Sequence, residues 1–357
     1  MDLSVCLVAT ELFEWGRRGG IGMATRTVGA ALVDRGVDVS VVVPQGEGQA
    51  PVEELDGMSV HGFPLWSYPL TSSLYRDVDA DVYHSEGLSW GSVIALNSVP
   101  RRKHMITFQN PRTREEWGEL YRFYPQRRRV FNALYRGRFV EALGRMDAVY
   151  CQCRCMVPKA MDLYDLEEEP GILPNPVDVP TEMPHKSENP TVCFLGRFDG
   201  EKRPELFLEQ AERFPEVRFI AMGRANDESV DGALRRKYGG STNLEMPGFI
   251  TGEGKRRILE EAWVLVNTSV SEGFPVSFLE AAAQGCAILS PHDPGGFTSR
   301  FGCCVGDGEL DEGLRLLLDS DRWKRKGEEG YAYVSEFHEK GRVMDMHMAA
   351  YEGLLEA

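Results

Sequence analysis

The chain has 357 residues, of which 42% are hydrophobic and 27% charged, and its formal net charge is −15. Its length predicts two domains, because a single core rarely grows beyond about 250–300 residues. The acidic balance argues against nucleic acid as a partner. No stretch reaches the roughly 20 apolar residues of a membrane span, and the start lacks the basic region of a signal peptide. We therefore expect a cytoplasmic protein.

The first half of the chain predicts alternating strands and helices. Residues 3–9 predict a buried strand, residues 23–35 a helix, and residues 39–43 the next strand, an order typical of a parallel sheet. A loop containing Gly19 and Gly20 precedes the helix, where glycine lets backbone N–H groups approach a ligand. This loop lacks the G-x-G-x-x-G pattern, so a nicotinamide dehydrogenase is the least favoured function.

Two more predicted strands end in polar residues. Residues 81–84 form a strand that ends at His84, and Gln109 follows the strand at 104–108. A single His at a strand end is more often structural. Glutamine can donate a hydrogen bond but cannot take up a proton near neutral pH.

The stretch from Arg101 to Arg145 is basic, with twelve Lys or Arg against four Glu. Within it, residues 115–143 predict helices with apolar residues set among arginines. One interpretation is a pair of solvated helices docked on the core. The other is a surface that binds an anionic membrane face or a phosphate-bearing acceptor.

Three cysteines alternate along the predicted strand at 148–155, namely Cys151, Cys153 and Cys155. The alternation predicts that they share one side of the strand. Their spacing does not match a zinc site, so we expect buried strand cysteines and no metal. Residues 173–190, rich in Pro, Glu and Ser, predict a linker. We therefore expect domains at 1–172 and 191–338, followed by a final helix at 339–357.

The second domain predicts two charged loops at strand ends. The strand at 191–195 leads into Gly196, Arg197 and Lys202, and two cations beyond one strand end suit a diphosphate. The strand at 263–267 leads into a loop with Glu272, and Glu280 follows in a helix at 276–284. The N-terminus of this helix offers free N–H groups for an anionic oxygen.

These two loops resemble a known family. Glu272 and Glu280, within EGFPVSFLEAAAQG, resemble the E-x7-E signature of family 4 retaining glycosyltransferases. The run from Gly196 to Lys202 resembles the G-R-x-x-x-x-K motif of that family, and residues 174–178 its PN-x-VD run. The resemblance implies the GT-B fold, which is an α/β fold of two Rossmann-like domains facing across a cleft. It also suggests that the C-terminal helix crosses back to the first domain.

The resemblance also implies roles for individual residues. Arg197 and Lys202 would stabilise the departing diphosphate, Glu272 would contact the donor sugar, and Glu280 would hold the ribose. Many members of the family carry a His where this chain has Gln109, so the resemblance implies that Gln109, or His84 as its substitute, contacts the acceptor or the sugar. Because glutamine cannot take up a proton near neutral pH, the resemblance does not imply proton transfer at Gln109. The residues implied to bind the donor are Gly19, Gly20, Gly196, Arg197, Lys202, Phe249, Ile250, Glu272, Gly273, Phe274, Pro275, Val276 and Glu280.

The expected function is transfer of a sugar from a nucleotide-diphospho-sugar to a hydroxyl acceptor, with retention of configuration. We expect no cofactor and no metal, because Arg197, Lys202 and the helix N-terminus would neutralise the diphosphate. The expected partners are a nucleotide sugar, an unknown acceptor and, through Arg101–Arg145, the inner face of an anionic membrane. The alternatives are a sugar-nucleotide epimerase, a non-catalytic sugar-nucleotide binding protein and a carboxylate-pair glycosidase.

Overall fold

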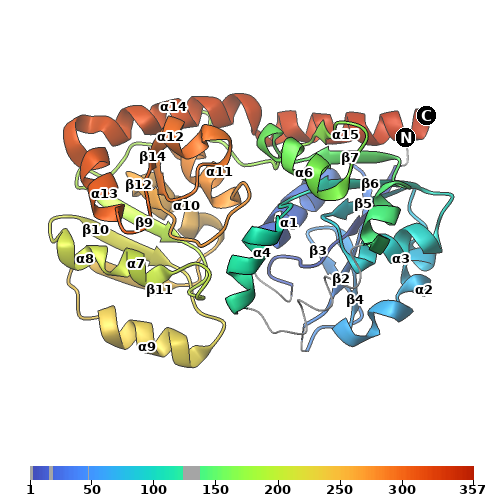
Figure 1. The fold of residues 1–357 in the computed structure, drawn as a ribbon, viewed down its shortest axis with the longest axis horizontal. Helices are drawn as coiled ribbons and strands as arrows, with labels where there is room; N and C mark the ends of the chain where they lie inside the picture. Colours follow the sequence, from blue (N-terminus) through green and yellow to red (C-terminus); the bar gives the residue numbers. More distant parts are fainter. Residues whose placement is uncertain (1–2, 16–18, 47, 124–136) are drawn as a thin grey trace. The chain divides into compact units, whose positions relative to one another are not determined.

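The computed structural model describes residues 3–15, 19–46, 48–123 and 137–357. The chain forms two compact units. The first consists of Met1–Arg114, Pro125–Pro176 and Lys340–Ala357, and the second of Glu115–Tyr124 and Val177–Glu339. Each unit contains one sheet of mostly parallel strands flanked by helices (Figure 1), which confirms the predicted α/β class. Residues 178–190, within the expected linker, contain no helix or strand.

The sheet of the first unit has the strand order β3-β4-β2-β1-β5-β6-β7-β8, parallel except for the β3–β4 pair. The antiparallel pair was not predicted from the sequence. It turns at Asp56 and Gly57, both with positive φ. The strands are β1 (Ser4–Val8), β2 (Asp38–Pro44), β3 (Val52–Leu55), β4 (Met58–Phe63), β5 (Val82–Glu86), β6 (Lys103–Phe108), β7 (Ala148–Cys151) and β8 (Gly171–Ile172).

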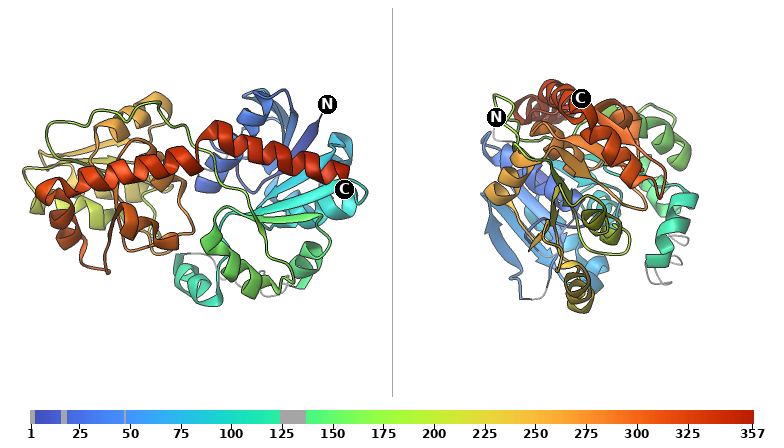
Figure 2. Two further views of the ribbon diagram at one scale, coloured as in Figure 1. Left: turned by 90° about the horizontal axis from the view of Figure 1, so that it is seen from above. Right: turned by 90° about the vertical axis from the view of Figure 1, so that its left-hand side faces the viewer.

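Helices cover both faces of this sheet and include the last helix of the chain. Met344 and Tyr351 of that helix are buried in the same apolar cluster as Leu7 and Leu32, and Figure 2 shows the helix lying along the first unit. The helices of the unit are α1 (Gly20–Val33), η1 (Leu65–Leu70), α2 (Ser72–Val78), α3 (Trp90–Ser98), η3 (Arg154–Met156), α6 (Val157–Tyr164) and α15 (Lys340–Glu356).

The second unit has an entirely parallel sheet in the order β11-β10-β9-β12-β13-β14. Its strands are β9 (Thr191–Leu195), β10 (Arg218–Met222), β11 (Leu244–Gly248), β12 (Val264–Val266), β13 (Ala287–Ser290) and β14 (Gly302–Cys304). The core is apolar and aromatic, with Phe207, Phe219 and Leu314 fully buried. Because β9 and β12 are adjacent and parallel, the loops that follow them emerge at one edge of the sheet.

The helices of the second unit follow the strand–helix alternation of the sequence. They are α4 (Arg114–Leu120) and η2 (Tyr121–Phe123), which join this unit from Glu115 onward, then α7 (Pro204–Leu208), α8 (Gln210–Arg213), α9 (Glu228–Tyr238), α10 (Gly252–Glu261), α11 (Val276–Ala283), η4 (Pro294–Gly296), α12 (Phe297–Phe301), α13 (Leu310–Leu318), η5 (Asp319–Asp321) and α14 (Arg322–Phe337). Gly285 has φ +76°, a left-handed conformation that ends α11.

Two strand boundaries differ from the prediction. β5 continues past His84 to Glu86, so a carboxyl group and not an imidazole stands at the end of this strand. β7 ends at Cys151, because Gln152 turns to donate to the backbone carbonyl of Gln109 and η3 begins two residues later. As a result Cys153 is half-buried and Cys155 exposed, and the predicted row of buried strand cysteines is wrong beyond Cys151.

Much of the predicted helical stretch at 115–143 lies outside the described residues. Helix α4 and the turn η2 account for its start, and residues 137–143 are helical at its end. None of the described helices is long and apolar enough to cross a lipid bilayer.

Candidate functional site

The loops after β9 and β12 are tied together by hydrogen bonds. The Thr268 hydroxyl donates to the carbonyls of Lys202 (2.6 Å) and Arg203 (2.9 Å). In return the Arg203 guanidinium donates to the carbonyls of Thr268 (2.7 Å) and Ser269 (3.0 Å) and pairs with Asp307 (2.9 Å). Arg203 also has φ +45°, a conformation that a non-glycine residue keeps only when its surroundings enforce it. These contacts fix the backbone on which Lys202 stands.

Lys202 and Glu272 meet where these loops join. The Lys202 ammonium lies 2.7 Å from Oε1 of Glu272, and the two side chains are 23% and 11% exposed. The same oxygen accepts hydrogen bonds from Asn267 Nδ2 (3.0 Å) and from the Ser269 hydroxyl. Burial opposes ionisation of Glu272, but the charge of Lys202 and these hydrogen bonds outweigh it and lower the pKa to about 2. Glu272 is therefore a carboxylate at neutral pH.

Arg197 lies in the same loop as Lys202 but has other partners. Its guanidinium contacts Asp199 (2.8 Å) and Glu201 (2.6 Å). Two acids of its own loop therefore neutralise this cation, which a diphosphate would have to displace or share. An Arg side chain has five N–H donors, so sharing is chemically possible.

Glu280 is paired with a cation that the sequence did not suggest. Its Oε1 lies 2.5 Å from Lys255 Nζ of α10, and both side chains are mostly buried. The loop between Glu272 and α11 carries the half-buried Gly273 and Pro275, with Pro275 as the N-cap residue of the helix. Its Phe274 is buried and packs edge-on against Phe297 at 5.2 Å between ring centroids, which anchors the loop to the core.

The remaining donor residues proposed for the second unit lie at strand ends of the same sheet. Gly196 follows β9, and Phe249 and Ile250 follow β11, where they are half-buried. Gly248 just before them has φ +91°, which turns the chain out of the strand. The sheet order places β11 two strands away from β9, so these residues share the carboxyl-end edge with Lys202.

The loop with Gly19 and Gly20 belongs to the first unit, and the Glu11 carboxylate fills the space beside Gly19. Gly19 is the N-cap residue of α1, and a Cβ added there would clash with Glu11 Oε1. That oxygen also accepts from the Gly22 N–H at 3.0 Å. Gly20, by contrast, has open space around it. An anion at this helix end would therefore have to displace the Glu11 carboxylate.

The other two candidates of the first unit lie in its interior. His84 is fully buried, and its ring nitrogens lie 2.8 Å from the Tyr351 and Thr107 hydroxyls. Both nitrogens are therefore engaged inside the unit. Gln109 is 5% exposed and donates to Oε2 of Glu86 at 2.7 Å. Glu86 was missed from the sequence, because the predicted strand ended at His84, two residues before the observed end of β5.

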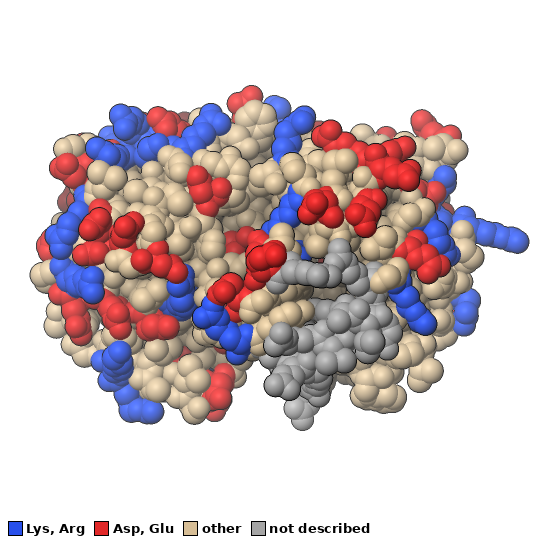
Figure 3. Space-filling model, viewed as in Figure 1, with Lys and Arg blue, Asp and Glu red and all other residues tan. Residues whose placement is uncertain are grey.

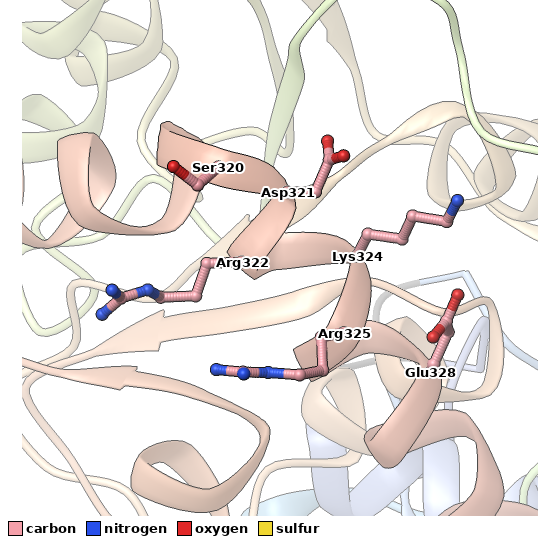
Figure 4. A pocket seen from close by; sticks show the side chains of 6 residues that line it. All are labelled: Ser320, Asp321, Arg322, Lys324, Arg325 and Glu328. Carbon is pink, nitrogen blue, oxygen red and sulfur yellow. The ribbon is translucent and has the colours of Figure 1, made fainter.

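One surface hollow lies away from these groups. It is formed by the N-terminal turn of α14 and the preceding turn, and its residues are Ser320, Asp321, Arg322, Lys324, Arg325 and Glu328. Figure 4 shows Arg322 and Arg325 extending to one side, away from Lys324 and Glu328. Its side chains do not converge on a common point, so we assign it no function. A smaller hollow lies beside the Lys202 loop, between Arg203, Thr268 and Asp307.

No cluster of three or more metal-ligating side chains occurs within residues 3–15, 19–46, 48–123 and 137–357. The arrangement described above can instead do two things. Buried carboxylates can accept hydrogen bonds from hydroxyl groups, and the Lys202 ammonium can hold an anionic oxygen while it keeps its bond to Glu272, since it has three donors.

Comparison with known families supports the resemblance seen in the motifs. The model of the family described as Glycosyltransferase Family 4 matches residues 18–180. The model described as Glycosyl transferases group 1 matches residues 180–301. The two matches are consecutive and confirm the resemblance that rested on Glu272, Glu280 and the Gly196–Lys202 run.

Solved structures with the same fold cover the whole chain. Sucrose-phosphate synthase (tll1590) from Thermosynechococcus elongatus has a TM-score of 0.76 at 14% identity, covering 99% of both chains. Anabaena Alr3699/HepE, solved with UDP-glucose, has a TM-score of 0.75 at 14% identity, covering 98% of this chain and 100% of that one. The pneumococcal O-GlcNAc transferase GtfA, solved with UDP and GlcNAc, has a TM-score of 0.72 at 9% identity and full coverage of both. The fold is GT-B, as predicted.

Curated relatives match over a shorter stretch. A phosphatidylinositol N-acetylglucosaminyltransferase subunit from Homo sapiens is 24% identical over 128 residues, which are 34% of this chain and 26% of that protein. The Arabidopsis thaliana protein of the same name is 25% identical over 127 residues, 33% of this chain and 28% of that protein. The match thus spans about a quarter of the length of these relatives.

Proposed function

Because this GT-B chain carries consecutive matches to the family 4 and group 1 glycosyltransferase models, we propose that it is a retaining glycosyltransferase that uses a nucleotide-diphospho-sugar. Sugar transfer is the activity these families have in common. The finer assignment depends on one observation, the contact between Lys202 and Glu272 at adjacent strand ends. This contact supports the assignment, because a cation that can bind a phosphate oxygen lies beside a carboxylate that can accept from sugar hydroxyls.

In the proposed reaction the bond between the anomeric carbon and the leaving phosphate oxygen breaks. A bond from the acceptor oxygen to that carbon forms on the same face, and the proton of the acceptor passes to the leaving phosphate oxygen. Lys202, Arg197 and the N-terminus of α11 at Val276 stabilise the charge that grows on the diphosphate. These groups supply the neutralisation that a metal ion would otherwise provide, so we propose that the reaction needs none.

The proposed site assigns the other groups to binding. Glu272 accepts hydrogen bonds from hydroxyls of the donor sugar. Glu280 accepts hydrogen bonds from the ribose and keeps its ion pair with Lys255. The Gly273–Val276 turn presents backbone N–H groups, and Phe249 and Ile250 lie at the strand end proposed to hold the base. Gly19 and Gly20 remain the proposed contacts from the first unit.

The test combines donor binding with turnover. UDP-, GDP- and ADP-sugars are screened by thermal shift, since a bound donor raises the melting temperature by mass action, and hydrolysis or transfer is then measured with the best donor. Lys202→Met and Glu272→Gln should each lose most of the turnover. Lys237→Met is the matched control, because Lys237 is a surface lysine of the same unit paired with Glu209. Normal turnover in both site variants would show that the site is misassigned.

The same screen separates the alternatives. Donor binding without turnover on any acceptor would indicate a non-catalytic sugar-nucleotide binding protein, and conversion of the donor without an acceptor would indicate an epimerase. Absence of nucleotide-sugar binding together with cleavage of a glycoside would indicate a glycosidase.

We also propose that the acceptor side meets an anionic membrane surface through the Arg101–Arg145 stretch. The basic sequence of this stretch and the lipid in the name of the curated relatives support the proposal. Its described part is partly neutralised, since Arg102 pairs with Asp79 (2.8 Å), and charges of both signs are interspersed on the face in Figure 3. Binding to phosphatidylserine vesicles that weakens with salt would support a membrane role; equal binding to neutral vesicles would contradict it.

A further inference from the structure

Four buried polar side chains form a chain of hydrogen bonds at the strand ends of the first unit. Glu86 is the last residue of β5, Gln109 follows β6, Gln152 follows β7 and Asn175 lies just beyond β8. They are between 2% and 5% exposed. A buried acid and three buried amides are costly unless their hydrogen bonds are satisfied, so the cluster must be closely fitted.

The donors and acceptors of this cluster run in one direction. Gln109 Nε2 donates to Glu86 Oε2 (2.7 Å), and Gln109 Oε1 accepts from Asn175 Nδ2 (3.0 Å). Asn175 also donates to Gln152 Oε1 (2.6 Å), and Gln152 Nε2 donates to the backbone carbonyl of Gln109. Glu86 is the acceptor at the end of the chain. The backbone carbonyl of Gln109 can only accept, so it orients the Gln152 amide, which in turn orients Asn175. Asn175 and Glu86 together orient the Gln109 amide between them.

Among the described residues, the ionisable groups that lie near Glu86 are two histidines and a tyrosine. His84 Nε2 of the same strand lies 3.8 Å from Glu86 Oε1, and Tyr351 and His347 of α15 lie beyond it. Burial lowers the pKa of His84 well below its usual value and that of His347 to about 4, so both are neutral at pH 7. Burial also raises the pKa of Glu86 to about 7, although the bond from Gln109 opposes this.

We propose that Glu86 is a positioning residue of the transferase, and that it orients the Gln109 amide so that the second hydrogen of Nε2 binds a substrate hydroxyl. The inference rests on the proposed function. It assigns a role to Glu86 and to its contact with Gln109. Glu86 itself does not need to touch the substrate or to move a proton in the reaction.

The mechanism follows from what each form of a carboxyl group can do. An ionised Glu86 only accepts hydrogen bonds, so Nε2 of Gln109 must face it and Oε1 must face Asn175. A protonated Glu86 carries no charge, so its oxygen binds Nε2 of Gln109 more weakly. The Gln109 amide cannot turn to compensate, because a turned amide would set its NH₂ group against Asn175 Nδ2, whose own orientation is fixed by Gln152. Protonation of Glu86 therefore loosens the Nε2 group that is offered to the substrate.

The first test does not require activity. The side-chain NH₂ resonances of Gln109, assigned by their loss in Gln109→Met, are followed by ¹H–¹⁵N NMR from pH 5.5 to 8.5. We expect them to shift with a midpoint near 7 in the wild-type chain and to stay constant in Glu86→Gln, which keeps an acceptor for Nε2 but cannot titrate. Resonances that do not shift, or that shift equally in Glu86→Gln, would overturn the inference.

The second test follows donor hydrolysis, with water as the acceptor, over the same pH range. We expect kcat/KM of the wild-type chain to fall about fivefold to tenfold from pH 8 to pH 6, the value of about one hydrogen bond, and to be nearly flat in Glu86→Gln. The control is Glu54→Gln, the same kind of substitution in the edge strand β3, which should keep the wild-type pH profile. The same pH profile in Glu86→Gln would contradict the inference. If the wild-type chain hydrolyses no donor at any pH, the proposed function is overturned instead. The NMR titration would still decide whether Glu86 orients Gln109.

Discussion

Two buried carboxylates stand at carboxyl ends of parallel strands, one in each unit, yet their surroundings have opposite effects. Glu272 contacts the Lys202 ammonium and two further donors, and its pKa falls to about 2. Glu86 contacts the neutral amide of Gln109, and its pKa rises to about 7. Burial opposes ionisation in both cases. The comparison shows that the charge of the partner, and not depth of burial, decides whether a buried acid is ionised at neutral pH.

The largest expected effect comes from removing the cation of the charged site. Lys202→Met should lower kcat by about 10²–10³-fold, as loss of a group that stabilises a transition-state charge does. It should also cost about 3 kcal/mol of unfolding free energy, because Glu272 is left buried without a counter-charge. Turnover assays and urea unfolding measure the two effects.

The double variant Lys202→Met/Glu272→Gln separates them. It should recover most of the stability and none of the activity, since the unpaired charge is gone but the cation is still missing. Recovery of activity in the double variant would show that Lys202 serves only to neutralise Glu272.

The second prediction concerns acid stability at the charged site. The pKa of Glu272 is about 2 in the folded chain against an ordinary value of 4.5. The contribution of Glu272 to the free energy of unfolding is therefore fully present above pH 4.5 and is lost as the pH falls toward 2. The expected size is about 3 kcal/mol. Unfolding of Glu272→Gln and the wild-type chain should differ at pH 6 and converge near pH 2; a constant difference over this range would contradict the assignment.

The third prediction concerns Glu86, whose effect on stability changes with pH in the direction opposite to that of Glu272. Because the pKa of Glu86 is about 7 in the folded chain and 4.5 in its ordinary state, the unfolded chain ionises first. The free energy of unfolding of the wild-type chain should therefore fall by up to about 3 kcal/mol between pH 4.5 and 7 because of Glu86. Glu86→Gln should remove that slope and be more stable than the wild-type chain at pH 8. If Glu86→Gln is less stable at pH 8 by as much as at pH 5, burial does not oppose ionisation of Glu86.

The smallest effect tests the glycine loop with two neighbouring substitutions. Gly19→Ala places a Cβ against the Glu11 carboxylate, whereas Gly20→Ala meets open space at the first turn of α1. We expect Gly20→Ala to be neutral or stabilising by about 0.4–1 kcal/mol. Gly19→Ala should cost about 1 kcal/mol, a small amount because Glu11 can swing away. Thermal unfolding of both variants measures the difference, and equal melting temperatures would show that Glu11 does not close the loop.

Most of the fold could be predicted because its signals are local. Buried parallel strands read as apolar runs, as in residues 191–195, and glycine after a helix marks its end, as at Gly285. The partners of Arg197 also lie within its own loop, at Asp199 and Glu201, so their spacing was visible in the sequence. Strand ends were less certain. The sequence does not show where β7 stops pairing with β6, and the cysteines beyond that point were placed wrongly.

The order of residues along the chain was enough to predict the alternation of strands and helices, the motif that identified the family, and the residues at the ends of β9 and β12. It was not enough to predict which of these residues meet. Lys202 and Glu272 are 70 residues apart, and Glu86 and Gln109 are 23 apart on different strands. Periodicity and turn residues act between near neighbours, whereas the ionisation of a buried acid depends on the partner that the strand order brings to it.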